Sequence, residues 1–151
     1  MSAGQPPAPP PPPGGGAREP DAELAVLAAN ALFYAAFSRR DVSAMEALWA
    51  RAEPVTCIHP GWNALIGRDE VLQSWRAILA NPASPSVEAS GESAHVAGDV
   101  AWVLCTEAAP DGEVQLIATN IYRREDGQWR LCHHQAGMLA KASPQAARTL
   151  N

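Results

Sequence analysis

The sequence predicts a single α+β domain in which three helices precede an antiparallel sheet. Apolar residues recur at intervals of three and four over most of residues 21–82, which is the period of an amphipathic helix. After Pro85 the period changes to two, and turn residues divide the chain into four segments, as is typical of strands. Because helices come first and strands later, without regular alternation, an α+β architecture is favoured over a parallel α/β sheet.

The first helix is expected to begin at Asp21. An aspartate after Pro20 is a good N-cap, and Glu23 falls in the first turn, where the helix dipole favours a negative charge. The apolar residues that follow form two adjoining stripes: Leu24, Leu27, Ala28, Ala31, Tyr34 and Ala35, and Val26, Phe33 and Phe37. A helix that is apolar around most of its circumference must be wrapped by other elements.

Two further helices are predicted in the first half of the domain. Asp41 can cap a short helix in residues 42–50, which would form a hairpin with the first. Another helix is expected in residues 67–82, with Asp69 and Glu70 in its first turn and Asn81-Pro82 at its end.

A short strand is predicted between the second and third helices, at Val55 to His59. The dipeptide Pro60-Gly61 follows it directly and is suited to a turn. Beyond Pro85, the turn signals Asp99, Asp111-Gly112 and Asp126-Gly127 separate four strands at the spacing of an antiparallel meander.

The two ends of the chain are predicted to lie outside the domain, which is expected to span residues 21–141. Residues 1–20 are rich in proline, glycine and alanine and hold no large apolar side chain after Met1, so a disordered or polyproline II tail is expected. Residues 142–151 are expected to form a C-terminal tail. No signal peptide is recognised, and no apolar run of about 18 residues that could span a membrane is present.

The net charge limits the classes of partner to be expected, and the cysteines indicate a cellular compartment. The formal net charge of −5 argues against a nucleic-acid-binding face, which is usually basic. Cys57, Cys105 and Cys132 are far apart and lie in strand-like apolar runs, as buried thiols do in a reducing compartment. A cytoplasmic protein is therefore expected.

Histidines are the main candidates for acid–base chemistry, because a neutral imidazole can accept or donate a proton near neutral pH. His59 ends the first strand beside the Pro-Gly turn, where side chains commonly face a cleft. His133 and His134 are neighbours on a strand and point to opposite faces unless a bulge intervenes. Trp129 and Leu131 share the face of His133, so His133 is expected to face the helices and the cavity, although a core histidine remains the alternative.

Other residues contribute weaker signals. Trp62, just after the turn, is expected in a pocket wall or a dimer contact, and Trp102 is a further candidate for the pocket. Asn120 is a polar residue within an apolar strand and needs hydrogen-bond partners. Glu107 and Arg124, near strand ends, are expected to be solvated. No metal is expected, because no local pair of ligands occurs, and no serine or cysteine nucleophile pattern and no phosphate-binding glycine loop is present.

Four stretches carry a resemblance to a known family: "ALWA", "VTCIHPGWNALIGRDEVLQSWRAILANP", "VAWVLCTEAA" and "ATNIYRREDGQWRLCHHQAG". In this order they resemble a SnoaL-like domain of the nuclear-transport-factor-two-like superfamily. The resemblance covers about residues 22 to 138. It implies a cone-shaped, strongly curved antiparallel sheet wrapped around the long N-terminal helix, a cystatin-like roll with a cavity between sheet and helices. Members are commonly homodimers that associate through the outer sheet face.

The resemblance also implies which residues line the cavity. By position these are His59, Trp62, Asn120 and His133, with Phe33, Tyr34 and Phe37 from the first helix. The superfamily includes polyketide cyclases, ketosteroid isomerases, limonene epoxide hydrolases, dehydratases, and members that only bind or assemble. The catalytic carboxylates of the isomerases and the aspartate-arginine-aspartate set of the epoxide hydrolases have no clear counterpart in this sequence, which speaks against both activities.

Two hypotheses of function follow. In the first, the domain is an isomerase, cyclase or dehydratase that moves a proton on a small, mostly apolar substrate. His133 or His59 would be the general base, and Asn120 or an indole N–H would stabilise the oxyanion. In the second, the domain only binds a hydrophobic ligand, or dimerises and presents the proline-rich tail to a partner. Neither hypothesis requires a cofactor.

Overall fold

The structure, a computed structural model, describes residues 19–139. The elements follow the predicted order except that β2 was not predicted: α1 (Glu19–Arg39), α2 (Val42–Leu48), β1 (Thr56–Ile58), β2 (Leu65–Ile66), α3 (Arg68–Ala80), β3 (Glu88–Ala97), β4 (Val100–Ala108), β5 (Gln115–Glu125) and β6 (Gln128–Met138). The described part of the chain holds no helix that is both long enough and apolar enough to cross a membrane. The predicted N-terminal tail lies outside the described residues except for its last two, which begin α1, and the predicted tail at residues 142–151 lies wholly outside them.

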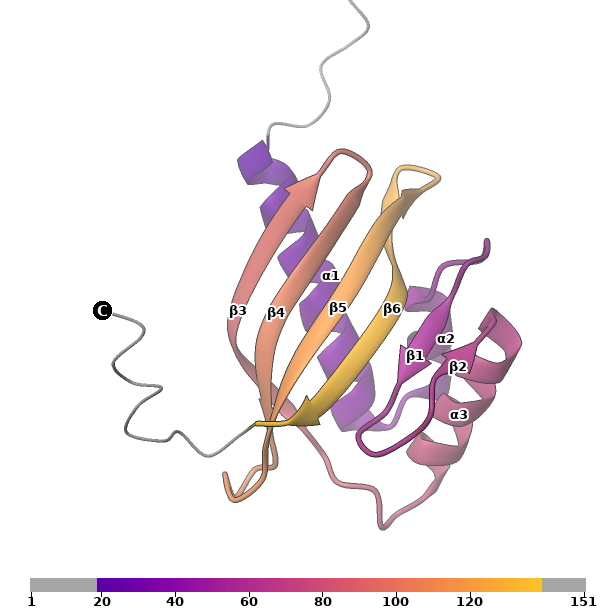
Figure 1. Cartoon of the computed structure of the whole chain (residues 1–151), viewed down its shortest axis with the longest axis vertical. Helices are drawn as coiled ribbons and strands as arrows, with labels where there is room; N and C mark the ends of the chain where they lie inside the picture. Colours follow the sequence, from indigo (N-terminus) through magenta and orange to yellow (C-terminus); the bar gives the residue numbers. More distant parts are fainter. Residues whose placement is uncertain (1–18, 140–151) are drawn as a thin grey trace, which may run out of the picture.

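The strands form one curved sheet in the order β2-β1-β6-β5-β4-β3. α1 crosses the back of this sheet, and α2 and α3 lie beside β1 and β2 (Figure 1). The α+β cone predicted from the sequence is therefore confirmed. One pairing differs from the expected antiparallel sheet, because β1 pairs with β6 in parallel. A parallel pair needs a long crossover, and the chain between β1 and β6 supplies it through α3 and the other strands.

α1 buries one side against the sheet. Val26 and Phe33 are fully buried, and the Phe33 ring meets the Trp75 ring of α3 edge to face with 5.5 Å between the centroids. The opposite side of α1 leaves Leu24 66% and Leu32 60% exposed. The prediction that this helix is wrapped around most of its circumference is therefore wrong on that side, because the sheet covers only one face of it.

Turn chemistry sets the register of the last hairpin. Asp126 and Gly127 have φ angles of 53° and 74°, and they connect β5 to β6 as a two-residue turn. Positive φ at both positions is the geometry whose twist matches that of the strands, and Asp-Gly is a preferred sequence for it. The sequence signal at residues 126–127 and the observed turn agree.

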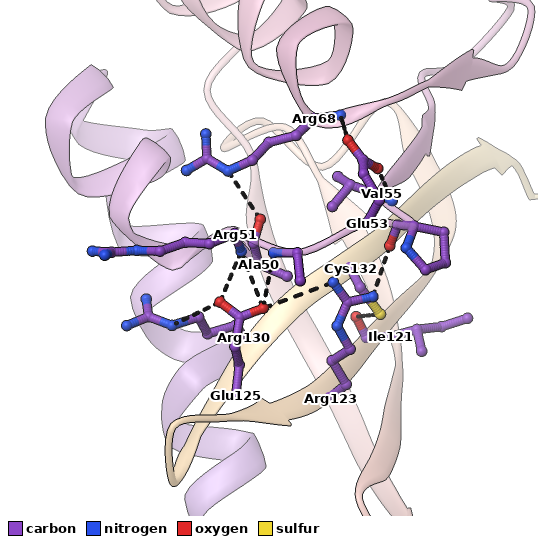
Figure 2. A network of polar contacts seen from close by, with 12 residues as sticks. Ala50, Arg51, Glu53, Val55, Arg68, Ile121, Arg123, Glu125, Arg130 and Cys132 are labelled. Atoms are coloured by element: carbon purple, nitrogen blue, oxygen red, sulfur yellow. Dashed lines mark hydrogen bonds and ion pairs between the residues drawn. The ribbon is translucent and has the colours of Figure 1, made fainter.

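The Glu125 carboxylate links this hairpin to the segment that follows α2 through hydrogen bonds (Figure 2). Glu125 accepts the backbone N–H of Arg51 at 2.8 Å and that of Ala52 at 3.2 Å. The guanidinium groups of Arg123 and Arg130 lie 3.7 Å from its oxygens. Burial acts to raise the pKa of Glu125, but the two backbone N–H groups and the two arginines together hold that pKa below its ordinary value.

We expect Glu125→Gln to lower the free energy of unfolding by about 2 kcal/mol at neutral pH, since hydrogen bonds to a charged group are replaced by weaker ones. A group with a lowered folded-state pKa contributes stability above its unfolded-state pKa and loses it as the pH falls. Urea unfolding should therefore show the deficit of the variant shrinking toward acid pH. The exposed Glu113→Gln is the control, and a deficit that does not change with pH would contradict this account of Glu125.

Candidate functional site

A pocket of about 280 Å³ opens beside the turn after β1. Its apolar walls are Phe37, Pro60, Ile78, Pro85, Val87 and Leu116. Its polar side chains are those of His59, Trp62, Ser84 and Glu107. A mostly apolar pocket with a few polar groups is typical of a site for a small molecule.

The turn at residues 59–62 forms one rim of this pocket. The backbone N–H of Trp62 donates to the carbonyl of His59 at 2.9 Å, and Gly61 between them has a φ of +79°, which glycine adopts without strain. The Trp62 indole is 49% exposed and stands edge-on to the His59 ring, 4.8 Å away between centroids. The structure thus places both His59 and Trp62 at the pocket.

Glu107 is the pocket residue that sequence reasoning missed. It was expected to be solvated, but it is only 2% exposed, so that prediction is wrong. Burial raises the pKa of its carboxyl from 4.5 to about 7, although the hydrogen bond from Tyr34 partly opposes this. The alternation of β4 could have indicated this burial, because Ala101, Val103 and Cys105 lie on the same inward face as Glu107.

A chain of hydrogen bonds leads from the interior to Glu107. His134 Nδ1 lies 2.5 Å from Asn120 Oδ1, and because an amide oxygen only accepts, the proton sits on Nδ1. Asn120 Nδ2 donates to Tyr34 Oη at 3.0 Å, and Tyr34 Oη donates to Glu107 Oε2 at 3.1 Å. Each group therefore donates toward the pocket, and the chain ends on the carboxylate.

Asn120 is held in place by a second branch of the same network. Its Nδ2 also donates to Asn30 Oδ1 at 2.9 Å, and Asn30 Oδ1 accepts from Tyr122 Oη at 2.9 Å. Both N–H groups of the Asn120 amide are thus engaged by protein. The expectation that Asn120 has hydrogen-bond partners is met by the protein itself, and no donor of this side chain is left for an oxyanion.

The two adjacent histidines face the opposite sides of the sheet from those expected. β5 pairs Tyr122 with Leu131 but Ile121 with His133, so Cys132 is an extra residue at a β-bulge. The bulge turns His134 inward, where it is fully buried, and turns His133 to the other face, where His133 Nδ1 lies 2.6 Å from Thr56 Oγ1. The prediction that His133 faces the cavity is wrong for this reason.

The aromatic residues that were predicted to line the pocket lie in three different parts of the fold. Phe37 lines the pocket, and Tyr34 supplies the hydrogen bond to Glu107. Phe33 lies deeper, in the core, with its ring 5.1 Å from that of His134. Trp102 is not at the pocket: it stacks on His95 on the outer face of the sheet and is 37% exposed. Its alternation with the buried Ala101 and Val103 explains the outward direction.

Burial keeps the pocket histidine uncharged. It lowers the pKa of His59 to about 4, so the imidazole is neutral at physiological pH. Within residues 19–139, no three His, Cys, Asp or Glu side chains are grouped so that they could hold a metal ion. The pocket brings together one carboxyl with a pKa near neutrality and one neutral imidazole.

The fold and this pocket define a small α+β roll of the NTF2-like class with a mostly apolar pocket. Residues 26–141 match the SnoaL-like domain, so the chain belongs to that family. A candidate dehydratase of the NTF2-like family from Streptomyces avermitilis is 35% identical, with a TM-score of 0.72 over 81% of this chain and 99% of that one.

Two further similar proteins are of other kinds. A candidate calcium/calmodulin-dependent protein kinase type II association domain from Thiobacillus denitrificans is 33% identical, with a TM-score of 0.68 over 76% of this chain and 94% of that one. The F-box protein SKIP8 of Arabidopsis thaliana is 24% identical over 115 residues, which are 76% of this chain. The match spans only half the length of the SKIP8 protein.

Proposed function

We propose that this domain is an enzyme that moves a proton on a small, mostly apolar substrate, with Glu107 as the acid–base group. The observation that carries the proposal is a carboxyl in an apolar pocket with a pKa of about 7. A general acid or base works best when its pKa lies near the working pH. The similarity to a candidate dehydratase supports the same class of chemistry.

The hydrogen bonds of Glu107 suit this role. Oε2 accepts from Tyr34, whereas Oε1 takes part in no hydrogen bond with the described residues. The ionised carboxylate can therefore take a proton from a carbon next to a substrate carbonyl through Oε1 and return it to another position. Trp62 and Ser84 are the pocket side chains with N–H or O–H donors that can face the enolate oxygen formed in between.

The test uses β-tetralone, an apolar cyclic ketone with acidic C–H groups beside its carbonyl, in heavy water. We expect the protein to accelerate exchange of these protons for deuterium, measured by proton NMR after subtraction of the buffer rate. Because the base must be ionised, the catalysed rate should rise with pH and level off above about 7. A rate equal to that in buffer at every pH would overturn the proposal.

A non-catalytic ligand-binding module is the second candidate function. The specific observation in its favour is the lining of the pocket by the Trp62 indole and six apolar side chains, which binding alone would explain. β-Tetralone separates the two functions. Quenching of tryptophan fluorescence without proton exchange would favour the binding module, whereas quenching with exchange favours the enzyme.

We also propose that two copies associate through the outer sheet face. Val100, Trp102, Leu104 and Ile117 are exposed there, and association with a second copy would remove these apolar side chains from water. The similarity to an association domain supports self-association. Sedimentation equilibrium should give a dimer for the wild type and a monomer for Trp102→Glu, and a monomeric wild type would contradict the proposal.

The three free thiols favour the cytoplasm as the compartment. Cys57, Cys105 and Cys132 are unpaired with one another, and burial raises the pKa of Cys57 to about 12 and that of Cys105 to about 11. Such thiols are inert at physiological pH. Cysteines that form no disulfides are typical of proteins in a reducing environment.

A further inference from the structure

The hydrogen bonds of Ser74 determine which nitrogen of His59 carries the proton. Ser74 Oγ lies 2.6 Å from the carbonyl oxygen of Val71 and 2.9 Å from His59 Nε2. A hydroxyl has one hydrogen, and a carbonyl can only accept it. The Ser74 proton is therefore given to Val71, and Ser74 must accept from His59, so Nε2 carries the imidazole proton.

His59 Nδ1 is consequently the acceptor nitrogen of the ring. The only hydrogen-bond partner it has among the described residues is the Cys57 sulfur, which lies 3.9 Å from Nδ1 and 3.7 Å from Nε2. A sulfur almost equally distant from both nitrogens is poorly aligned with the lone pair of Nδ1. His59, which lines the pocket, thus has one acceptor nitrogen whose hydrogen bond within the described residues is only the long one to the Cys57 sulfur.

The pocket offers no counterpart to a negatively charged ligand. No lysine or arginine is among its lining residues, and its carboxyl becomes negative as the pH rises. A carboxylate or phosphate would lose its hydration there without gaining a charged partner. An uncharged molecule with a hydroxyl group would instead bury its apolar part against the walls and offer His59 Nδ1 a stronger hydrogen bond than the Cys57 sulfur does.

We infer that the pocket is selective for uncharged, hydroxyl-bearing apolar molecules, and that His59 Nδ1 is the group that recognises the hydroxyl, with Ser74 as the positioning residue that fixes the imidazole proton on Nε2. This inference rests on the proposed small-molecule pocket, and it assigns to His59 a role separate from that of Glu107. The inference requires His59 to accept a hydrogen bond, whereas the proposed function requires Glu107 to exchange a proton.

The test compares three probes of similar shape by isothermal titration calorimetry. β-Naphthol has a hydroxyl, β-fluoronaphthalene has no donor, and β-naphthoate carries a negative charge. We expect the wild type to bind β-naphthol about tenfold more tightly than β-fluoronaphthalene, as one net hydrogen bond would give, and β-naphthoate more weakly than either. Equal affinity for the first two probes, or tightest binding of β-naphthoate, would overturn the inference.

Variants separate His59 from Glu107 as the source of this preference. His59→Phe keeps a ring against Trp62 and Trp75 but removes the acceptor, so the preference for β-naphthol should disappear. Glu107→Gln should keep it. A preference that survives in His59→Phe and is lost in Glu107→Gln would transfer the role to the carboxyl and overturn the inference, while leaving the proposed proton transfer intact.

A spectroscopic measurement keeps the inference testable even if His59→Phe does not fold. Long-range proton–nitrogen NMR correlations should show His59 of the wild type with the proton on Nε2. Ser74→Ala removes the acceptor of that proton, so the two tautomers should mix and the preference for β-naphthol should weaken. A wild-type spectrum with the proton on Nδ1 would contradict the inference, and failure of all three probes to bind would count against the pocket and the inference together.

Discussion

Glu107→Gln is expected to slow the proton exchange of β-tetralone by about 10² to 10⁴-fold, the range that a positioned general base supplies. Glutamine has nearly the same shape, and its amide oxygen can still accept the hydrogen bond that Tyr34 Oη gives to Glu107 Oε2. The walls of the pocket are unchanged. Exchange followed by proton NMR should therefore fall while quenching of tryptophan fluorescence by β-tetralone remains.

Two control variants make this result specific. Glu113→Gln removes an exposed carboxyl in the connection between β4 and β5, and His133→Ala removes a histidine on the outer face of the sheet, where it contacts Thr56. Both should exchange β-tetralone at the wild-type rate. Full activity of Glu107→Gln would show that another group is the base, and loss of activity in His133→Ala would contradict the assignment of its face.

Phe33→Ala is expected to lower the free energy of unfolding by about 3 to 5 kcal/mol, as is usual for a buried phenylalanine. Phe33 is fully buried, and its ring packs edge to face on Tyr34 at 4.9 Å and on Trp75 at 5.5 Å between centroids. These neighbours come from α1 itself and from α3, so the cavity cannot close without moving a helix. Urea unfolding monitored by circular dichroism measures the loss.

The matched control is Leu24→Ala, on the exposed side of the same helix. Leu24 is 66% exposed, so its truncation should change the free energy of unfolding by no more than about 0.5 kcal/mol. Helix propensity differs little between leucine and alanine. If the two variants of α1 lost equal stability, the division of this helix into a buried and an exposed side would be wrong.

The architecture could be predicted because each element has its own periodic signal. The change from a period of three and four to a period of two after Pro85, the cap at Asp41 and the turn at Asp126-Gly127 are local features, and all of them appear in the structure. The parallel pairing of β1 with β6 was not predicted. It joins segments far apart in the sequence, and nothing local indicates its direction.

The site was less predictable, because its residues depend on tertiary contacts. The bulge at Cys132 arises from pairing with β5 and exchanges the faces of His133 and His134, which alternation alone cannot reveal. Glu107 was misjudged because a glutamate near a strand end is usually solvated, and its burial depends on Tyr34 from α1. His59 and Trp62 do line the pocket, and a strand end followed by a Pro-Gly turn is a local signal in the sequence.

The most direct test is a pH titration of the Glu107 carboxyl carbon by carbon-13 NMR, with the resonance assigned by its absence from Glu107→Gln. The protein should show a midpoint near a pKa of about 7, because burial in the pocket disfavours the charged form. Such a value means that the carboxyl can give and take a proton at physiological pH. A midpoint near the ordinary value of 4.5 would show a solvated glutamate and would contradict the proposed acid–base role.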